Sequence, residues 1–196
     1  MTEHDFTVKV HFPDGKIDGF RTVKIDGWAG VGIVCPRSLF QKKKKEDVFR
    51  KAGVYVLVGR SGEKGKEKIY IGMADPILDR LETHCKEKDF WTKTIFFTSI
   101  DDSLTATHAK FLESRLITLA RESGQCELDN ANTSGEPSQS REEVSRMEKF
   151  LREMRKCFGT WIQGVSRRKP TIRKADLSFA PVRWPLSRKR TALIPK

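Results

Sequence analysis

The chain has 196 residues, of which 38 are Lys or Arg and 26 are Asp or Glu, so its formal net charge is +12. This length suits one ordinary domain with appendages and excludes two full-sized independent domains. The charge favours a polyanionic partner, nucleic acid in the first place. The alternatives are a soluble protein whose surface is simply cationic and a protein that touches anionic lipid.

No segment has the run of roughly 18 apolar residues that a membrane span requires, and the N-terminal MTEHDFTVKV lacks the basic and apolar regions of a secretion signal. We therefore expect a cytoplasmic protein with no membrane partner. The cysteines are scattered singly, without the CxxC pairs of zinc or redox motifs, and we expect them to be reduced. They are Cys35, Cys85, Cys126 and Cys157.

Residues 5–34 alternate short β-like runs with Asp-Gly turn signals, a pattern that predicts a small β-meander. The following segment, QKKKKED at 41–47, contains four consecutive lysines. Such a run is usually a solvated connector, although lysines beside a nucleic-acid cleft would also suit phosphates.

Two runs of β-branched and aromatic residues, at about 53–59 and 68–73, predict a β-hairpin. Asp75 as N-cap and Pro76 in the first turn predict a helix over about 76–87. A third strand is expected at about 93–99. Residues 101–103, DDS, offer N-caps for a helix at about 104–122, the clearest in the chain because one of its faces is apolar.

The second half ends in a polar loop at 131–142, a helix at about 143–158 and a basic segment. The apolar face of this last helix is most simply a cover for the core, with a docking face for a partner protein as the alternative. From Arg167 onward the chain has ten Lys or Arg against one Asp, so the final thirty residues should lack a core of their own.

These elements predict an α/β (α+β) fold with a small central antiparallel sheet of three or more strands flanked by helices. We divide the chain into an N-terminal β-segment at 1–48, a main domain at 49–165 and a basic tail at 166–196.

The hairpin and the elements after it carry polar residues in a distinctive order. Gly53-Val54-Tyr55 followed by Tyr70-Ile71-Gly72 resembles the paired signature of the GIY-YIG nuclease superfamily, with Val54 in place of isoleucine and a longer hairpin loop than usual. The spacing of the downstream residues also matches the family. They are Arg80, His84, Glu113 and Asn130.

The resemblance implies a metal-dependent endonuclease that hydrolyses nucleic-acid phosphodiesters, DNA before RNA, to leave a 3′-hydroxyl and a 5′-phosphate. It implies one divalent ion, Mg²⁺ or Mn²⁺, with Glu113 as its protein ligand, and a GIY-YIG nuclease domain at 49–165. The implied catalytic residues are Tyr55, Tyr70, Arg80, His84, Glu113 and Asn130.

The residue types suit this chemistry. Arg80 and His84 are one helical turn apart and share a face, and a guanidinium can clamp a phosphate oxygen. A single carboxylate such as Glu113 is a common protein contribution to Mg²⁺. A nearby metal and arginine could lower the pKa of a tyrosine, so that either Tyr55 or Tyr70 orients or deprotonates the attacking water. His84 could share that role or bind phosphate, and Asn130 would position phosphate or a ligand.

Taken singly, each of these residues has an ordinary structural explanation, but six in family order favour an active site. We read His108 and Glu82 as surface residues. A nucleic-acid-binding module with the same fold and no activity is the alternative function. We expect the nucleic-acid contacts from Lys68, Arg80, His84, Arg167, Arg168 and Lys169.

Overall fold

The computed structural model describes residues 5–62, 66–131 and 138–162. A single seven-stranded sheet runs through them in the order β1-β2-β3-β6-β4-β5-β7. The strands are β1 (Val8–His11), β2 (Arg21–Ile25), β3 (Gly30–Pro36), β4 (Gly53–Arg60), β5 (Glu67–Ala74), β6 (Trp91–Ser99) and β7 (Cys126–Leu128).

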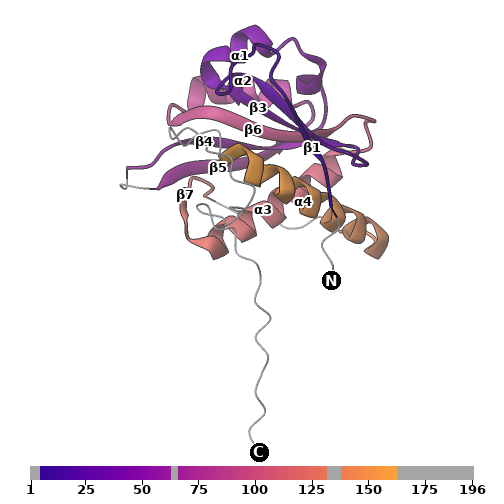
Figure 1. Ribbon diagram of the computed structural model, residues 1–196. Helices are drawn as coiled ribbons and strands as arrows, with labels where there is room; N and C mark the ends of the chain where they lie inside the picture. Colours follow the sequence, from indigo (N-terminus) through magenta and orange to yellow (C-terminus); the bar gives the residue numbers. More distant parts are fainter. Residues whose placement is uncertain (1–4, 63–65, 132–137, 163–196) are drawn as a thin grey trace, which may run out of the picture.

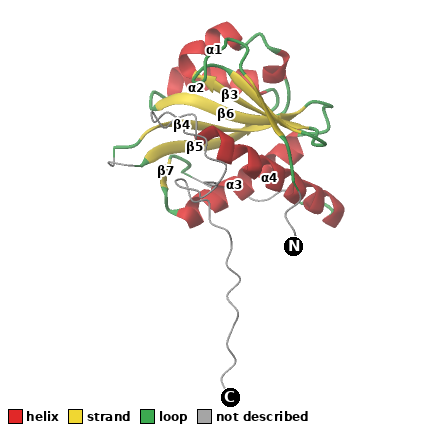
Figure 2. Cartoon of the chain, in the orientation of Figure 1, coloured by secondary structure: helices red, strands yellow, loops and turns green. Residues whose placement is uncertain are grey.

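Helices cover both faces of this sheet, which makes three layers (Figure 1, Figure 2). On one face lie α1 (Arg37–Lys43), the short 3₁₀ helix η1 (Asp47–Arg50) and α2 (Ile77–Glu87). On the other lie α3 (Ala106–Ser123) and α4 (Arg141–Ile162). Each face has its own cluster of buried apolar side chains, because alternate residues of every strand point to opposite faces.

The α/β (α+β) class is confirmed, but the prediction of an antiparallel sheet was wrong at one edge. Six strands pair antiparallel, whereas β5 pairs with β7 in parallel, from Glu67 opposite Cys126 to Ile69 opposite Leu128. The β-segment at 1–48 contributes β1, β2 and β3 to the same sheet, since β3 pairs with β6 along its whole length.

Most predicted elements lie where the patterns placed them, and the differences are local. The lysine-rich segment at 41–47 is partly helical, since α1 extends to Lys43. Phe40 is the buried residue of this helix. Asp75 does not cap α2. The N-cap position is Pro76, and the Ile77 amide donates to the Lys51 carbonyl oxygen at 3.1 Å.

The α3 helix begins with a capping box that the sequence reading missed. Thr105 is the N-cap, its hydroxyl accepts from the His108 amide, and the His108 ring accepts in return from the Thr105 amide. The prediction that His108 is a surface residue was therefore wrong, because the side chain is buried against the helix start. Glu82 does lie at the surface, paired with Lys44 at 2.8 Å.

The last helix is confirmed as a cover for the core, since Met147, Leu151, Met154 and Cys157 are buried in the cluster beneath it. Cys35, Cys85, Cys126 and Cys157 form no disulfide bonds. Within the described part of the chain, no helix has the length and apolar character needed to cross a membrane. The basic tail at 166–196 lies outside the described residues.

Candidate active site at the edge of β5

The β4–β5 hairpin places both tyrosines on the sheet face that α2 covers. Tyr55 lies opposite Gly72, and Leu57 lies opposite Tyr70, so the two tyrosines are diagonal neighbours with ring centroids 6.3 Å apart. The Tyr55 ring passes over Gly72, where a Cβ atom would overlap the tyrosine hydroxyl. The glycine of the second tripeptide is therefore required by the tyrosine of the first.

The first glycine has a similar explanation. A Cβ atom on Gly53 would overlap the carbonyl oxygen of Phe97 on β6 and would lie 2.5 Å from Cδ1 of Ile77 at the start of α2. Gly53 thus allows β4, β6 and the helix that carries Arg80 to approach one another closely.

The α2 helix brings its basic residues over the tyrosines. Ile77, Leu81 and His84 point into the core, whereas Arg80 is exposed. The His84 Nε2 atom lies 2.8 Å from the Tyr55 hydroxyl, and the His84 ring meets the Tyr70 ring edge-on with centroids 5.0 Å apart. The tyrosine hydroxyls, that of Tyr70 most strongly, interact with the Arg80 guanidinium and raise its pKa.

Glu113 and Asn130 reach the site from the other side of the sheet, at the edge of β5 beyond its short pairing with β7. The Glu113 Oε1 atom on α3 accepts from the Met73 amide at 3.1 Å. The Asn130 side chain accepts from the Ile71 amide at 2.9 Å and donates to the Ile71 carbonyl oxygen at 2.7 Å. Two side chains thus continue the hydrogen bonding of this edge where β7 ends.

The charges in this region influence one another. Burial raises the pKa of Tyr55, helped by Tyr70 and opposed by Arg80. Burial also raises the pKa of Glu113, opposed by the Met73 amide, Lys110 and Arg80. The Arg80 charge lowers the pKa of Tyr55, His84 and Glu113 alike, so the protonation of these three groups is linked through one guanidinium.

Arg80 acts to lower the pKa of Tyr55, but burial outweighs the guanidinium, so without a metal ion the pKa of this tyrosine is raised. Tyr55 is 1 % exposed, whereas Tyr70 is partly exposed. Of the two tyrosines, Tyr70 is therefore the one that a water molecule can reach.

His84 is neutral at physiological pH in this environment. Burial, with smaller contributions from Arg80 and Lys88, lowers its pKa from 6.5 to about 4. The neutral imidazole can accept a hydrogen bond from the Tyr55 hydroxyl. Its ring is fully buried, so in this conformation it has no surface with which to contact phosphate.

Glu113 fits a role as one ligand of a divalent cation. One carboxylate oxygen is committed to the Met73 amide, and no ion pair compensates its charge among the described residues. The same residues hold no cluster of three or more His, Cys, Asp or Glu side chains that could bind a metal by themselves. A bound Mg²⁺ would thus rely on water and substrate oxygens for its other ligands, as this ion often does.

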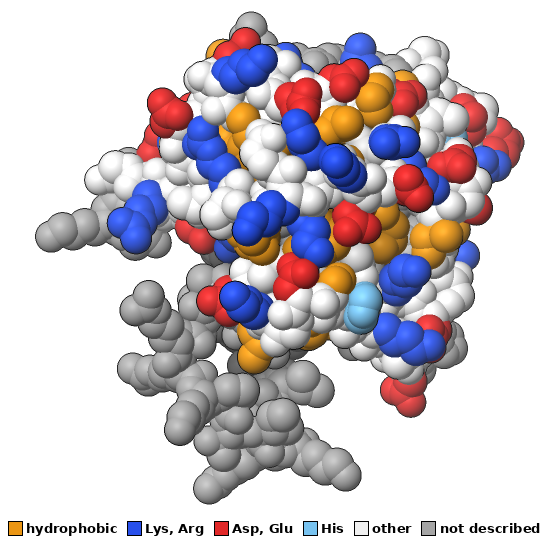
Figure 3. Space-filling model, turned by 90° about the horizontal axis from the view of Figure 1, so that it is seen from above, with side chains coloured by type: hydrophobic (Ala, Val, Ile, Leu, Met, Phe, Trp, Pro, Cys, Tyr) orange, Lys and Arg blue, Asp and Glu red, His pale blue; other side chains and the backbone are white. Residues whose placement is uncertain are grey.

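The six residues predicted as catalytic lie together, but the predicted nucleic-acid contacts do not. Lys68 is engaged by Asp129 at 2.8 Å and by Glu127 at 3.2 Å. Arg167, Arg168 and Lys169 lie outside the described residues. On the face that bears α1 and α2, basic and acidic side chains are interspersed (Figure 3).

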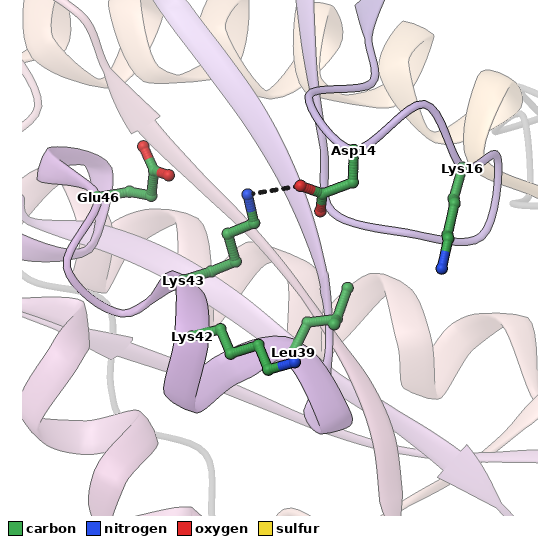
Figure 4. A pocket seen from close by; sticks show the side chains of 6 residues that line it. All are labelled: Asp14, Lys16, Leu39, Lys42, Lys43 and Glu46. Carbon is green, nitrogen blue, oxygen red and sulfur yellow. Dashed lines mark hydrogen bonds and ion pairs between the residues drawn. The ribbon is translucent and has the colours of Figure 1, made fainter.

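A hollow beside the lysine run lies apart from this site. Figure 4 shows Lys43 reaching Asp14, at 2.9 Å, while Lys16 points away from that pair. None of the six predicted catalytic residues lines the hollow, whose walls are Asp14, Lys16, Leu39, Lys42, Lys43 and Glu46. Two of the five charged side chains there, Lys43 and Asp14, are thus paired with each other.

Sequence reasoning missed Lys88, which adjoins Tyr70, and Asp129, which pairs with that lysine. The Lys88 ammonium lies 4.5 Å from the centre of the Tyr70 ring and 2.6 Å from an Asp129 carboxylate oxygen. A spacing of four residues from Arg80 through His84 to Lys88 is the signal that could have found the lysine.

Comparisons of the chain with protein-family models, with curated proteins and with solved structures gave no match.

We predict that Gly72→Ala displaces the Tyr55 hydroxyl from His84, because the added Cβ atom overlaps it. Overpacking of this kind costs about 1–3 kcal/mol in the free energy of unfolding, so the melting temperature should fall. Gly62→Ala is the matched control, since a Cβ atom there meets nothing within 4 Å. Equal melting temperatures for the two variants would contradict the packing of Tyr55 over Gly72.

His84 should make stability depend on pH in mildly acidic solution. Its pKa of about 4 in the folded protein lies below the 6.5 of an unperturbed histidine, so the unfolded chain binds more protons between these values. The stability is complete above about pH 6.5 and is lost as the pH falls toward 4, by at most about 3 kcal/mol.

Urea unfolding at pH 7 and pH 5 measures this effect in wild type, in His84→Gln and in the control His11→Gln, which replaces an exposed histidine. We expect the His84 variant to lose part of the acid sensitivity and the control to keep it. The same pH dependence in all three proteins would exclude a buried neutral His84.

Proposed function

We propose that the protein is a metal-dependent endonuclease that hydrolyses phosphodiester bonds of nucleic acid, DNA in the first place. The observation that supports this most is the convergence of side chains from three separate segments at one stretch of β5. The β4–β5 hairpin supplies Tyr55 and Tyr70, α2 supplies Arg80 and His84, and α3 supplies Glu113. The resemblance of these residues to the GIY-YIG signature supports the same conclusion.

The residues divide into an accessible and a buried group. Arg80 is exposed and interacts with the Tyr70 hydroxyl, so its guanidinium can bind a non-bridging phosphate oxygen beside that hydroxyl. Tyr70 is partly exposed and orients the attacking water. Tyr55 and His84 are buried and hydrogen-bonded to each other, and Tyr70 packs against this fixed pair.

Glu113 would hold the divalent cation, Mg²⁺ or Mn²⁺, which when bound neutralises charge on the phosphate oxygens and assists the leaving alkoxide. The Met73 amide holds one Glu113 oxygen at the edge of β5, so the direction of the carboxylate is fixed by the strand that also carries Tyr70. Asn130 fixes the preceding part of the same edge through Ile71.

The charge distribution supports nucleic acid as the substrate. Residues 167–196 carry ten basic residues and one acidic residue, and thus nine of the twelve excess positive charges of the chain. Such a segment supplies sequence-independent affinity for phosphate backbones, which weakens as salt increases.

The test of this function is the behaviour of two substitutions at Glu113. Glu113→Gln removes the charge but keeps an oxygen that can accept from the Met73 amide, so this variant should fold with wild-type stability. Cleavage of labelled linear, supercoiled, branched and single-stranded substrates with Mg²⁺ or Mn²⁺ should fall at least about a hundredfold. Binding of nucleic acid should change little.

Glu113→Ala should lose both cleavage and stability. It also leaves the Met73 amide without its partner, which costs about 1–3 kcal/mol in the free energy of unfolding. Glu122→Gln, an exposed carboxylate on the same helix, is the control for general effects of charge. Wild-type cleavage by Glu113→Gln would contradict the assignment of the metal ligand. Binding without cleavage of any substrate by the wild-type protein would favour the inactive binding module.

A further inference from the structure

Three contacts fix the position of Lys88. It lies directly after α2, where its amide donates to the His84 carbonyl oxygen at 3.1 Å. Its ammonium lies 4.5 Å from the centre of the Tyr70 ring and pairs with Asp129 at 2.6 Å. A lysine on a flexible stem needs such partners to stay in one place.

The backbone on either side of Lys88 is also fixed. Arg37 on α1 donates to the Lys88 carbonyl oxygen at 3.0 Å and to the Cys85 carbonyl oxygen at 2.9 Å, and its guanidinium stacks 4.8 Å from the centre of the Trp91 ring. Trp91 donates from its indole nitrogen to the His84 carbonyl oxygen at 3.3 Å. The end of α2 is therefore held by side chains from α1 and β6.

Asp129 joins this lysine to the β5 edge. One carboxylate oxygen accepts from Lys88 and the other pairs with Lys68 of β5 at 2.8 Å. Burial alone would raise the pKa of Asp129, but its hydrogen bonds from Lys68 and Lys88 outweigh burial and lower it. The carboxylate is therefore charged, and it precedes Asn130, which binds Ile71.

This geometry gives the Tyr70 ring two close partners. The His84 ring meets it edge-on at 5.0 Å, and the Lys88 ammonium covers it at 4.5 Å. The lysine side chain is 23 % exposed and that of Asp129 is 21 % exposed, so both are shielded more than the partners of an ordinary surface ion pair. A cation held over a ring under these conditions restricts the orientation of the ring.

We propose that Lys88, held by Asp129, is a positioning residue that acts on the reaction through Tyr70. It keeps the tyrosine in the orientation in which Arg80 reaches the hydroxyl oxygen, and it does so by its charge rather than by bulk. This proposal rests on the proposed nuclease function for its kinetic consequences and on the geometry alone for its effect on Tyr70.

The kinetic test compares Lys88→Met, which keeps most of the stem and removes the charge, with Lys88→Arg, which keeps a cation. We expect Lys88→Met to lower kcat by about five- to thirtyfold with an unchanged KM, a loss that corresponds to the usual strength of a shielded cation–ring contact. Lys88→Arg should restore most of the rate, and Asp129→Asn should reproduce the loss because it releases the ammonium. Lys86→Met, an exposed lysine of the same helix, is the control and should cut at the wild-type rate.

The second readout needs no activity. The chain contains only two tyrosines, so ring-labelled tyrosine gives two sets of NMR signals, which Tyr55→Phe assigns. Lys88→Met should shift or broaden the Tyr70 signals, leave those of Tyr55 in place and leave the control Lys86→Met unchanged. Lys88→Arg should return the Tyr70 signals toward their wild-type positions.

The outcomes separate the two proposals. If the wild-type protein cleaves nothing but Lys88→Met moves the Tyr70 signals, the nuclease function fails and the contact stands. Unchanged Tyr70 signals in Lys88→Met would overturn the positioning role. A raised KM and a salt dependence of binding reduced by about one phosphate contact, at constant kcat, would also overturn it and make Lys88 a phosphate ligand.

Discussion

The edge of β5 beyond its pairing with β7 is the constraint on which the arrangement of the site depends. The parallel ladder ends at Ile69, opposite Leu128, and the backbone groups that follow on this edge need other partners. Asn130 satisfies both polar groups of Ile71, and Glu113 satisfies the Met73 amide. An open strand edge is thus closed by two polar side chains rather than by another strand.

This closure places a carboxylate beside the tyrosines without a dedicated loop. Tyr70 and Gly72 face α2, whereas Ile69 and Ile71 face α3, so a side chain bound at the edge can act on groups from either face. Arg80 accordingly influences Glu113 from across the strand. Hydrogen bonding by the carboxylate and its proposed role as a metal ligand are compatible, because they use different oxygens.

Burial separates the polar residues of the site into two kinds. Tyr55 and His84 are enclosed, and their pKa shifts both favour the uncharged form. Arg80 is exposed, and Tyr70 and Lys88 are partly exposed. The two charges and the tyrosine hydroxyl therefore lie where an incoming anion could approach them. The enclosed pair therefore gives the accessible group a rigid support, as precise positioning of reactive groups requires.

The sequence predicted the parts of this arrangement that depend on local pattern. The strands β4 to β6 and the helices α2 to α4 follow from periodicity, and the order of the polar residues brought all six of them to attention. β7 was missed because three residues carry too little pattern, and its parallel pairing with β5 joins segments far apart in the chain. His108 was misjudged because a capping box on a buried helix start looks like a surface turn in sequence.

The roles of individual side chains were the least predictable part. Lys68 looked like a phosphate contact, but Glu127 and Asp129, which approach it through the unpredicted β7 pairing, engage it. The direction of the Tyr55 pKa shift depends on how completely α2 covers the ring, which no local pattern shows. The basic C-terminal segment was predicted from composition and lies outside the described residues.

The central claim is that a divalent cation binds where Glu113 meets the β5 edge, and paramagnetic broadening by Mn²⁺ tests it most directly. In NMR spectra of the full chain, substoichiometric Mn²⁺ should broaden the Met73 amide and the Tyr70 ring signals first. Excess Mg²⁺ should reverse the effect, and Glu113→Gln should abolish it. Broadening centred on another acidic group, such as Asp14 and Glu46 beside the lysine run, would contradict the account.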